Sequence, residues 1–257
     1  MDVIVIGNKP YKNISLNKII DSFAINYRCN MSLPDKNNGS KQHNLGLCIH
    51  LYDNLISRKI GREAFINIYK SEYRETEINE FFDNFDKKLY NNVYFAKDNV
   101  GTYNQMLGTY GIPYRFNKQP RTGYSIMFDR LIAGETVFIS NFSVTDEPRV
   151  SYYVKEAAYE TECHSKEDEL KIIRWLHNNG KIDATLCMLV DTDELTLNCK
   201  GMKPTKFMLG ELLKEHDHCV LVDMDQDNGL LETLSEYEIK IDGNIYISKN
   251  SNTLEYE

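Results

Sequence analysis

The sequence predicts an α/β protein: a mostly parallel β-sheet with helices on both faces, a lid segment, and a C-terminal α+β extension. Through the first two-thirds of the chain, short apolar runs of strand length alternate with amphipathic stretches of helix length. This alternation is the rhythm of βαβ units. From about residue 191 the pattern changes to strands, a helix and a hairpin. We therefore expect one domain over 1–190, with the lid at about 143–164, and an extension over 191–257.

The expected strands are rich in β-branched and aromatic residues and end at turn residues. The first of them, DVIVI, is apolar at almost every position, which is typical of a strand buried on both faces. The last is a hairpin that turns at Asp242 and Gly243. The strands are expected at 2–6, 25–30, 45–50, 92–96, 136–140, 184–190, 218–223 and 237–248.

The expected helices carry apolar residues at a spacing of three and four. The helix that begins after Ser165 has the clearest boundaries, because this serine can cap it, Asp168 occupies its third position and Gly180 follows its end. Gly134 ends the preceding helix in the same way. The helices are expected at 14–24, 74–90, 123–134, 165–180 and 205–216.

Composition and charge narrow the classes of partner. The 257 residues include 42% hydrophobic and 26% charged residues, and 38 acidic against 30 basic side chains give a net charge of −8. This balance repels a phosphate backbone, so we expect no nucleic-acid partner. The apolar runs are too short to span a bilayer, and the N-terminus lacks the pattern of a secretory signal. We therefore expect a cytoplasmic protein.

Cysteines and acidic motifs do not predict a metal centre. None of the six cysteines forms C-x-x-C, so buried free thiols are expected. HDHC at 216–219 lacks a second ligand pair. D-x-D occurs at 191–193 and 223–225, and the second resembles an EF-hand loop whose sixth and twelfth positions are Asn228 and Leu234 instead of glycine and glutamate. Acidic turns are the favoured interpretation, and no metal or other cofactor is expected.

Polar residues follow several of the expected strands. In an open parallel sheet, ligands bind beyond the carboxyl ends of the strands. Gly7 and Asn8 follow the first strand, Asn30 ends the second, His50 ends the third, and the serine and asparagine of SNFS at 140–143 follow the strand TVFIS. A glycine lets the backbone approach a ligand, and asparagine both donates and accepts. Asparagines that merely cap turns remain the alternative.

A histidine and three tyrosines lie farther along the chain. His164 precedes a helix cap on an expected exposed loop end, where an imidazole is suited to general-base catalysis or contributes only local packing. Tyr152, Tyr153 and Tyr159 lie in the irregular stretch before it, and irregular stretches of this length often form lids. Their hydroxyls are suited to stabilising a departing phosphate, although VSYYV also reads as a solvent-facing strand.

Taken in order, these stretches resemble the small bacterial sialyltransferases of glycosyltransferase family 42. That family has Gly-Asn-x-Pro after its first strand, Arg-Cys-Asn at the end of its second, a Ser/Thr-Gly helix start that leads to a strand ending in serine, and His-Ser-Lys after a lid. The resemblance covers blocks within about 1–190. The matching residues are Gly7, Asn8, Pro10, Arg28, Cys29, Asn30, Thr122, Gly123, Ser140, His164, Ser165 and Lys166.

The resemblance implies a Rossmann-like nucleotide-sugar-binding catalytic domain in which His164 is the general base. It also implies that the three tyrosines lie near the leaving phosphate. The chain departs from the family at three places: Asn141 stands for a glycine, Thr145 for the first lid tyrosine, and His50 for an asparagine. The donor-binding residues it implies are Gly7, Asn8, Arg28, Asn30, His50, Arg121, Thr122, Gly123, Ser140 and Asn141.

The reaction that the resemblance implies is transfer, with inversion, of sialic acid or a related nonulosonic acid. The donor is the CMP-sugar, and the acceptor is a glycan hydroxyl such as one of lipo-oligosaccharide or capsule. A monophosphate leaving group needs no metal when amides and hydroxyls stabilise it. The alternatives are a metal-dependent UDP- or GDP-sugar transferase that uses a D-x-D motif, and a non-catalytic nucleotide-sugar-binding protein. Peripheral contact with an inner membrane and assembly into a homo-oligomer are both compatible with the sequence.

Overall fold

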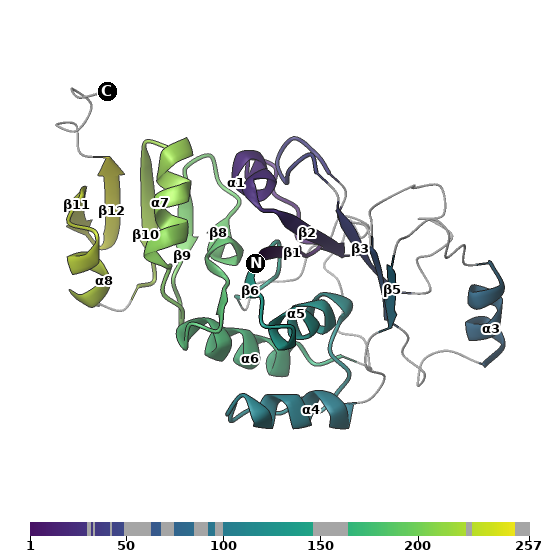
Figure 1. Ribbon diagram of the computed structural model, residues 1–257. Coiled ribbons are helices and arrows are strands. Elements are labelled where there is room, and N and C mark those ends of the chain that lie inside the picture. The colour runs from purple at the N-terminus through teal and green to yellow at the C-terminus, as the bar shows by residue number, and fades with distance from the viewer. Residues whose placement is uncertain are drawn as a thin grey trace.

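The computed structural model describes residues 1–29, 32, 34–41, 43–48, 63–67, 75–84, 92–95, 100–145, 164–224 and 228–249 of the 257-residue chain. Figure 1 shows a central sheet with helices on both sides and a second sheet at one end of the molecule. The prediction of a Rossmann-like α/β fold is therefore confirmed. Most of the expected lid, residues 146–163, lies outside the described residues.

The first sheet has seven strands in the order β5-β4-β3-β2-β1-β6-β7, and every neighbouring pair is parallel. The chain runs outward from β1 to β5 and then returns to the other side of β1. The order therefore reverses between β1 and β6, where Ile6 lies beside Ser140. The strands are β1 (Asp2–Ile6), β2 (Ile25–Cys29), β3 (Asn44–Cys48), β4 (Glu63–Asn67), β5 (Asn92–Phe95), β6 (Thr136–Ser140) and β7 (Ile182–Asp183).

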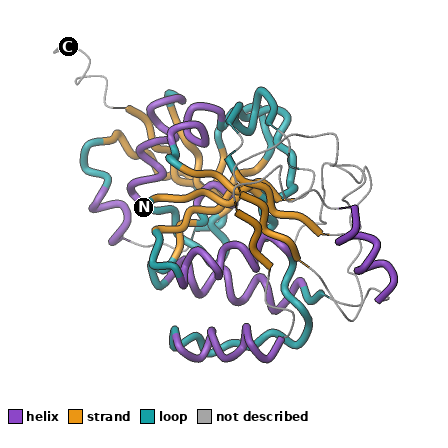
Figure 2. The backbone as a smooth tube through the Cα atoms, turned by 45° about the vertical axis from the view of Figure 1, so that its right-hand side comes forward, coloured by secondary structure: helices purple, strands orange, loops and turns teal. Residues whose placement is uncertain are grey.

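Helices cover both faces of this sheet. On β2, Arg28 points toward the segment that packs on α1, and Cys29 points the other way, toward the start of α5. Side chains alternate between the two faces of a strand, so α1 and α5 lie on opposite faces. In Figures 1 and 2, α4 lies on the outer side of α5 and α6. The helices of this region are α1 (Asn17–Ser22), α3 (Glu75–Asn84), α4 (Val100–Thr109), α5 (Thr122–Ile132) and α6 (Lys166–Asn178).

The second sheet is mixed, with the order β11-β12-β10-β9-β8. Strand β10 is parallel to β9 and antiparallel to β12, and the predicted hairpin of β11 and β12 is confirmed, with Gly243 at φ 69° in its turn. Helix α7 packs on β10. The elements are η3 (Thr185–Met188), β8 (Leu189–Val190), β9 (Thr196–Asn198), α7 (Lys206–Glu215), β10 (His218–Val222), α8 (Asn228–Thr233), β11 (Tyr237–Asp242) and β12 (Asn244–Lys249).

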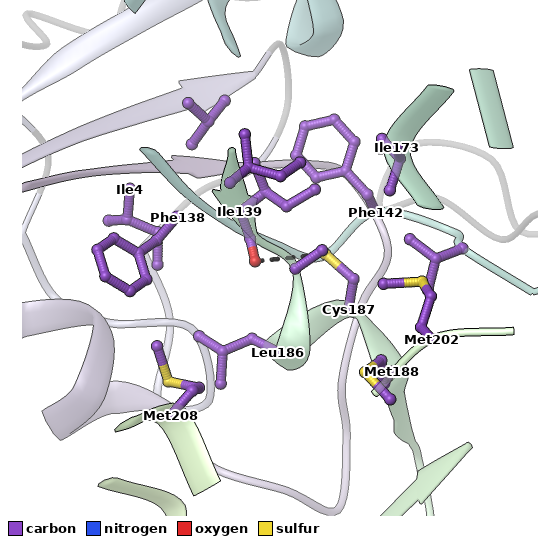
Figure 3. Close-up of a cluster of buried hydrophobic side chains, with 14 of the residues drawn as sticks. Ile4, Phe138, Ile139, Phe142, Ile173, Leu186, Cys187, Met188, Met202 and Met208 are labelled. Atoms are coloured by element: carbon purple, nitrogen blue, oxygen red, sulfur yellow. Dashed lines mark hydrogen bonds between the residues drawn. The ribbon is translucent and has the colours of Figure 1, made fainter. Parts of the chain in front are cut away.

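One hydrophobic core joins the two sheets. Figure 3 shows Ile4 and Phe138 of the first sheet in the same cluster as Leu186 and Met208, which belong to η3 and α7. The Cys187 thiol donates to the carbonyl oxygen of Ile139 (S···O 3.3 Å), and burial raises the pKa of this thiol to about 12. The four cysteines whose side chains the structure describes are buried and free, as predicted: Cys29, Cys187, Cys199 and Cys219.

One predicted strand is wrong. Residues 184–190 form mostly the 3₁₀ helix η3, and only the last two residues are a strand. The chain turns there because Asp183 accepts a hydrogen bond from the Thr185 N–H (2.8 Å) and the His177 ring accepts one from the Ala184 N–H (3.0 Å). Among the described residues, no helix is long and apolar enough to cross a membrane.

Candidate functional site

The carboxyl ends of β1 and β6 are tied together by hydrogen bonds. The Gly7 N–H donates to the carbonyl oxygen of Ser140 (2.8 Å), and the Lys9 N–H donates to that of Asn141 (2.9 Å). The Asn141 side-chain amide donates back to the carbonyl oxygen of Lys9 (2.6 Å), and its oxygen accepts from the Ser140 hydroxyl (2.6 Å). The point where the strand order reverses is therefore held in one conformation.

The backbone conformation of Asn141 suits an asparagine or a glycine. Its φ is 61°, in the left-handed region that glycine and asparagine enter most readily. A glycine there would follow the same backbone path. The asparagine follows it too, and adds the two side-chain hydrogen bonds to Lys9 and Ser140.

Two glycines at this edge are required by close packing within the chain. A Cβ on Gly7 would lie 2.4 Å from the Asn141 carbonyl oxygen and 3.0 Å from the Phe142 ring. A Cβ on Gly123 would lie 2.5 Å from the same ring. The Phe142 ring therefore lies between the two glycines. This packing accounts for both glycines without a ligand, although it does not test their predicted donor-binding role.

Asn8 carries an orphaned polar atom at the same edge. Its side-chain oxygen is buried, and it has no hydrogen-bond partner in the described part of the chain. A buried acceptor without a partner costs free energy, so such an atom is often completed by a ligand or by water. The amide oxygen of Asn8 is thus suited to accept a hydrogen bond from a bound molecule beside Gly7.

His164 is buried, with 8% of its surface exposed, so the expectation of an exposed loop end is wrong. Its Nδ1 lies 2.7 Å from the carbonyl oxygen of Gln119, because the segment before α5 runs across the ring. A carbonyl oxygen only accepts, so Nδ1 carries the proton, and a neutral ring has its lone pair on Nε2. This contact gives His164 the tautomer that a general base acting through Nε2 requires.

The first turn of α6 holds the segment that covers His164. The Asp168 carboxylate accepts from the backbone N–H (2.8 Å) and side-chain amide (3.2 Å) of Asn117. Glu169, whose side chain is fully buried, accepts from the Arg121 N–H (3.0 Å) and pairs with its guanidinium. The predicted cap is confirmed, since Ser165 accepts from the Asp168 N–H (3.3 Å).

The start of α5 connects His164 with the ends of the central strands. Thr122 begins this helix, three residues after the Gln119 carbonyl that holds the imidazole. A Cβ on Gly123 would lie 3.2 Å from the Cys29 sulfur at the end of β2, as well as against Phe142. The first turn of α5 therefore lies at the carboxyl edge of the sheet. The structure brings His164, Thr122 and the loop that carries Asn8 to one side of the molecule.

Arg28 does not reach this edge. It is fully buried, and its guanidinium donates to the carbonyl oxygens of Asn38, Gly39 and Lys41 on the α1 face of the sheet. The other predicted arginine, Arg121, is paired with the acid at the start of α6 described above. Five predicted site residues lie outside the described residues: Asn30, His50, Tyr152, Tyr153 and Tyr159.

Sequence reasoning missed the residues that position the imidazole, namely Gln119, Asp168 and Glu169. Two acids in the first turn of a helix read as ordinary partners of the helix dipole, and nothing in the sequence connects them with the segment before α5. The first D-x-D aspartate also has a structural role that was not foreseen. The Asp191 carboxylate accepts from the backbone N–H groups of Lys12 and Asn13, both at 2.9 Å.

Among the described residues, no group of three histidine, cysteine or acidic side chains is placed to hold a metal ion. Asp223 of the second D-x-D is exposed, at φ 54°, and is contacted by the Asn198 amide (3.4 Å). Comparison of the sequence with models of known protein families and with curated proteins finds no match.

Proposed function

We propose that the chain is an inverting glycosyltransferase that moves sialic acid, or a related nonulosonic acid, from its CMP derivative to a hydroxyl of a glycan acceptor. One observation carries the proposal. His164, held in a base-competent tautomer by Gln119, lies by the start of α5 on the sheet edge where the orphaned oxygen of Asn8 is found. The order of motifs shared with the family 42 sialyltransferases supports the same function.

In this proposal, the donor binds at the edge of the first sheet. Asn8 accepts a hydrogen bond from a donor hydroxyl or amino group. The phosphate lies at the first turn of α5, where backbone N–H groups and the helix dipole favour an anion and the Thr122 hydroxyl can donate. A ligand at this place matches the rule that open parallel sheets bind beyond the strand ends where their order reverses.

In the proposed reaction, the acceptor oxygen attacks the anomeric carbon of the donor sugar while Nε2 of His164 takes the proton of that hydroxyl. The bond between the anomeric carbon and the phosphate oxygen breaks, and CMP leaves with the bonding electrons. Attack on the face opposite the leaving group inverts the anomeric configuration. General-base catalysis of this kind contributes about 10²–10⁴-fold to a rate.

The rival functions have less support. A metal-dependent UDP- or GDP-sugar transferase would act through one of the two D-x-D motifs. The Asp191 carboxylate already holds the loop after β1, and the exposed Asp223 lies on the second sheet, at the end of β10. A non-catalytic nucleotide-sugar-binding protein would not require the tautomer that Gln119 imposes on His164. A cytoplasmic enzyme that works on lipo-oligosaccharide or capsule precursors fits the proposed donor.

The test is a transfer and hydrolysis assay with CMP-sialic acid on the wild type and His164→Ala. We expect the variant to lose about 10²-fold or more of the activity while CMP still raises its Tm. His218→Ala is the matched control, because this exposed histidine on β10 pairs with Glu194 and lies in the second sheet, far from the edge. Full turnover by His164→Ala would refute the assignment of the base.

Nucleotide preference and metal dependence separate the rival classes. In a thermal-shift panel of CMP, CDP, UDP and GDP, we expect CMP to give the largest stabilisation. Activity that survives EDTA supports the proposed enzyme, and activity lost in EDTA and restored by Mn²⁺ or Mg²⁺ supports the D-x-D transferase. Stabilisation by CMP without transfer or hydrolysis by the wild type would support the binding protein.

A further inference from the structure

Strand β11 forms an open edge of the second sheet, far from the proposed active site (Figure 1). On one side it pairs with β12 through all six of its residues. Within the described part of the chain, no hydrogen bond or ion pair reaches Glu238, Ile239, Lys240, Ile241 or Asp242 from its other side. In an antiparallel ladder every second residue turns its N–H and C=O away from a given neighbour, so the outer side of β11 presents unpaired backbone groups.

The two faces of β11 differ in polarity. Ile239 and Ile241 lie opposite Ile247 and Ile245 of β12, which are buried, and so they share the apolar face of the sheet. Ile241 is nevertheless 61% exposed, because β11 is the last strand of this sheet among the described residues. Glu238, Lys240 and Asp242 alternate with these residues and are exposed on the opposite face. The apolar face of β11 therefore adjoins buried residues of β12 on one side and is open along its outer edge.

We propose that β11 pairs antiparallel with β11 of a second copy of this chain, about a two-fold axis at Ile239. The resulting dimer joins the two small sheets into one continuous sheet. This pairing covers the exposed Ile241 and satisfies the outward backbone groups of both copies. It is independent of the proposed activity, since no residue of β11 belongs to the candidate site.

The charges and the apolar residues of β11 together select this register. Directly opposite residues in an antiparallel pair lie on the same face, so only registers that place isoleucine opposite isoleucine or tyrosine keep both apolar faces together. An axis at Glu238 would set that glutamate against its own copy, and an axis at Lys240 would set two lysines together. An axis at Ile241 would set Lys240 against Asp242 twice, but it would leave Ile239 opposite Gly243 of the hairpin turn. An axis at Ile239 sets Glu238 against Lys240 twice and keeps both isoleucines opposite apolar residues.

In this register the apolar face also matches. Tyr237 of one copy faces Ile241 of the other on both sides of the axis, and the two Ile239 side chains meet at its centre. Aromatic and β-branched side chains are favourable cross-strand neighbours. Glu236, which would come next opposite Asp242, precedes the strand and already pairs with Lys206 (3.3 Å). Within β11, therefore, no like charges oppose each other.

The experiment measures the mass of the full chain by size-exclusion chromatography with light scattering over a range of protein concentrations. We expect the wild type to reach twice the mass of one chain. Lys240→Glu and Glu238→Lys should each remain single chains, because each sets like charges opposite each other twice. The double variant, Glu238→Lys with Lys240→Glu, restores opposite charges and should dimerise again.

The control variant is Lys181→Glu, which makes the same change of charge at an exposed position outside β11. It should dimerise like the wild type, and all variants should keep the wild-type circular dichroism spectrum and Tm measured below the dimerisation range. A wild type that stays a single chain at every concentration overturns the proposal. So does a dimer that survives Lys240→Glu, or a folded double variant that fails to dimerise.

Discussion

The two sheets of the molecule bury different kinds of residue. In the described part of the chain, all buried polar and charged residues lie between Asn26 and Thr185, and all but Thr185, the first residue of η3, belong to the strands, helices and loops of the first sheet. From Leu186 onward, the buried residues are apolar. Buried polar groups cost free energy unless they are hydrogen-bonded, so a fold keeps them where they position something. The buried polar groups therefore gather around the first sheet, which carries the proposed active site, whereas the second sheet carries the proposed dimer edge.

The strand patterns show the same difference. Strand β1 is buried at every position from Val3 to Ile6, as a central parallel strand must be when helices cover both faces. In β11, half-buried Tyr237 and Ile239 alternate with exposed charged residues. A sheet covered on both faces gives a rigid platform for a site, whereas a sheet with an open edge offers a surface to another strand.

The largest expected effect compares a core residue of the first sheet with a partly exposed ring on α7. Ile4→Ala removes a fully buried side chain between two parallel strands and should lower the free energy of unfolding by about 2–5 kcal/mol. Phe207→Ala on α7 removes a ring that is 55% exposed and tilts against the Phe138 ring (centroids 5.7 Å apart), and should cost about 1 kcal/mol. Urea denaturation measures both losses. Equal losses would show that the two regions are packed alike.

Two glycines in helices test the packing at the sheet edge. Gly123→Ala places a methyl group against the Phe142 ring and should cost about 1–3 kcal/mol. Gly210→Ala in α7 is the matched control, because its nearest neighbour would be the Tyr237 hydroxyl at an ordinary 3.5 Å. The control should gain about 0.5–1 kcal/mol from helix propensity. If Phe142 is the obstacle, Phe142→Leu should recover part of the Gly123→Ala loss.

The smallest expected effect depends on pH. Burial raises the pKa of Asp21, but hydrogen bonds from Ser40 and Lys41 outweigh it and hold this pKa below its usual 3.8. The folded pKa is the lower one, so the stabilisation is complete above the usual value and is lost as the pH falls through the folded pKa. Solvent screens this partly exposed carboxylate, so Asp21→Asn should cost less than about 1 kcal/mol at pH 7 and still less in acid.

The matched control for Asp21→Asn is Asp217→Asn, at an exposed position before β10 that makes no side-chain hydrogen bond among the described residues. Unfolding by urea at several pH values should show no difference between this variant and the wild type. If Asp21→Asn lowers the free energy of unfolding equally at low pH, then the shape of the Asp21 side chain, rather than its charge, stabilises the segment between β2 and β3.

The sequence predicted the elements whose periodicity is strong and whose ends carry local signals. Strand β1, the hairpin of β11 and β12, and the capped helix α6 are examples, because each is specified by neighbouring residues. Helix α4 was missed, since VGTYNQMLGT contains two glycines and two threonines, which disfavour a helix. It is helical because Tyr103 and Leu107 are buried against the rest of the fold, which no local pattern reveals.

The site was only partly predictable for the same reason. Motif order identified Asn8, Thr122 and His164, and the structure brings their segments to one edge. The burial of His164 depends on the distant Gln119 carbonyl, and the engagement of Arg28 depends on a loop ten or more residues away. The local sequence shows that an arginine or histidine is present, but contacts with distant segments determine which groups its side chain binds.

Asn141 has a consequence for the speed of ligand capture. Its side chain links the segments that follow β1 and β6, so the loss of entropy from ordering this edge occurs when the protein folds. A molecule arriving there meets a surface that is already shaped, and its association rate is governed by diffusion and orientation instead of a slow rearrangement of these two loops. An alanine at this position would reintroduce that rearrangement as a step on the way to the complex.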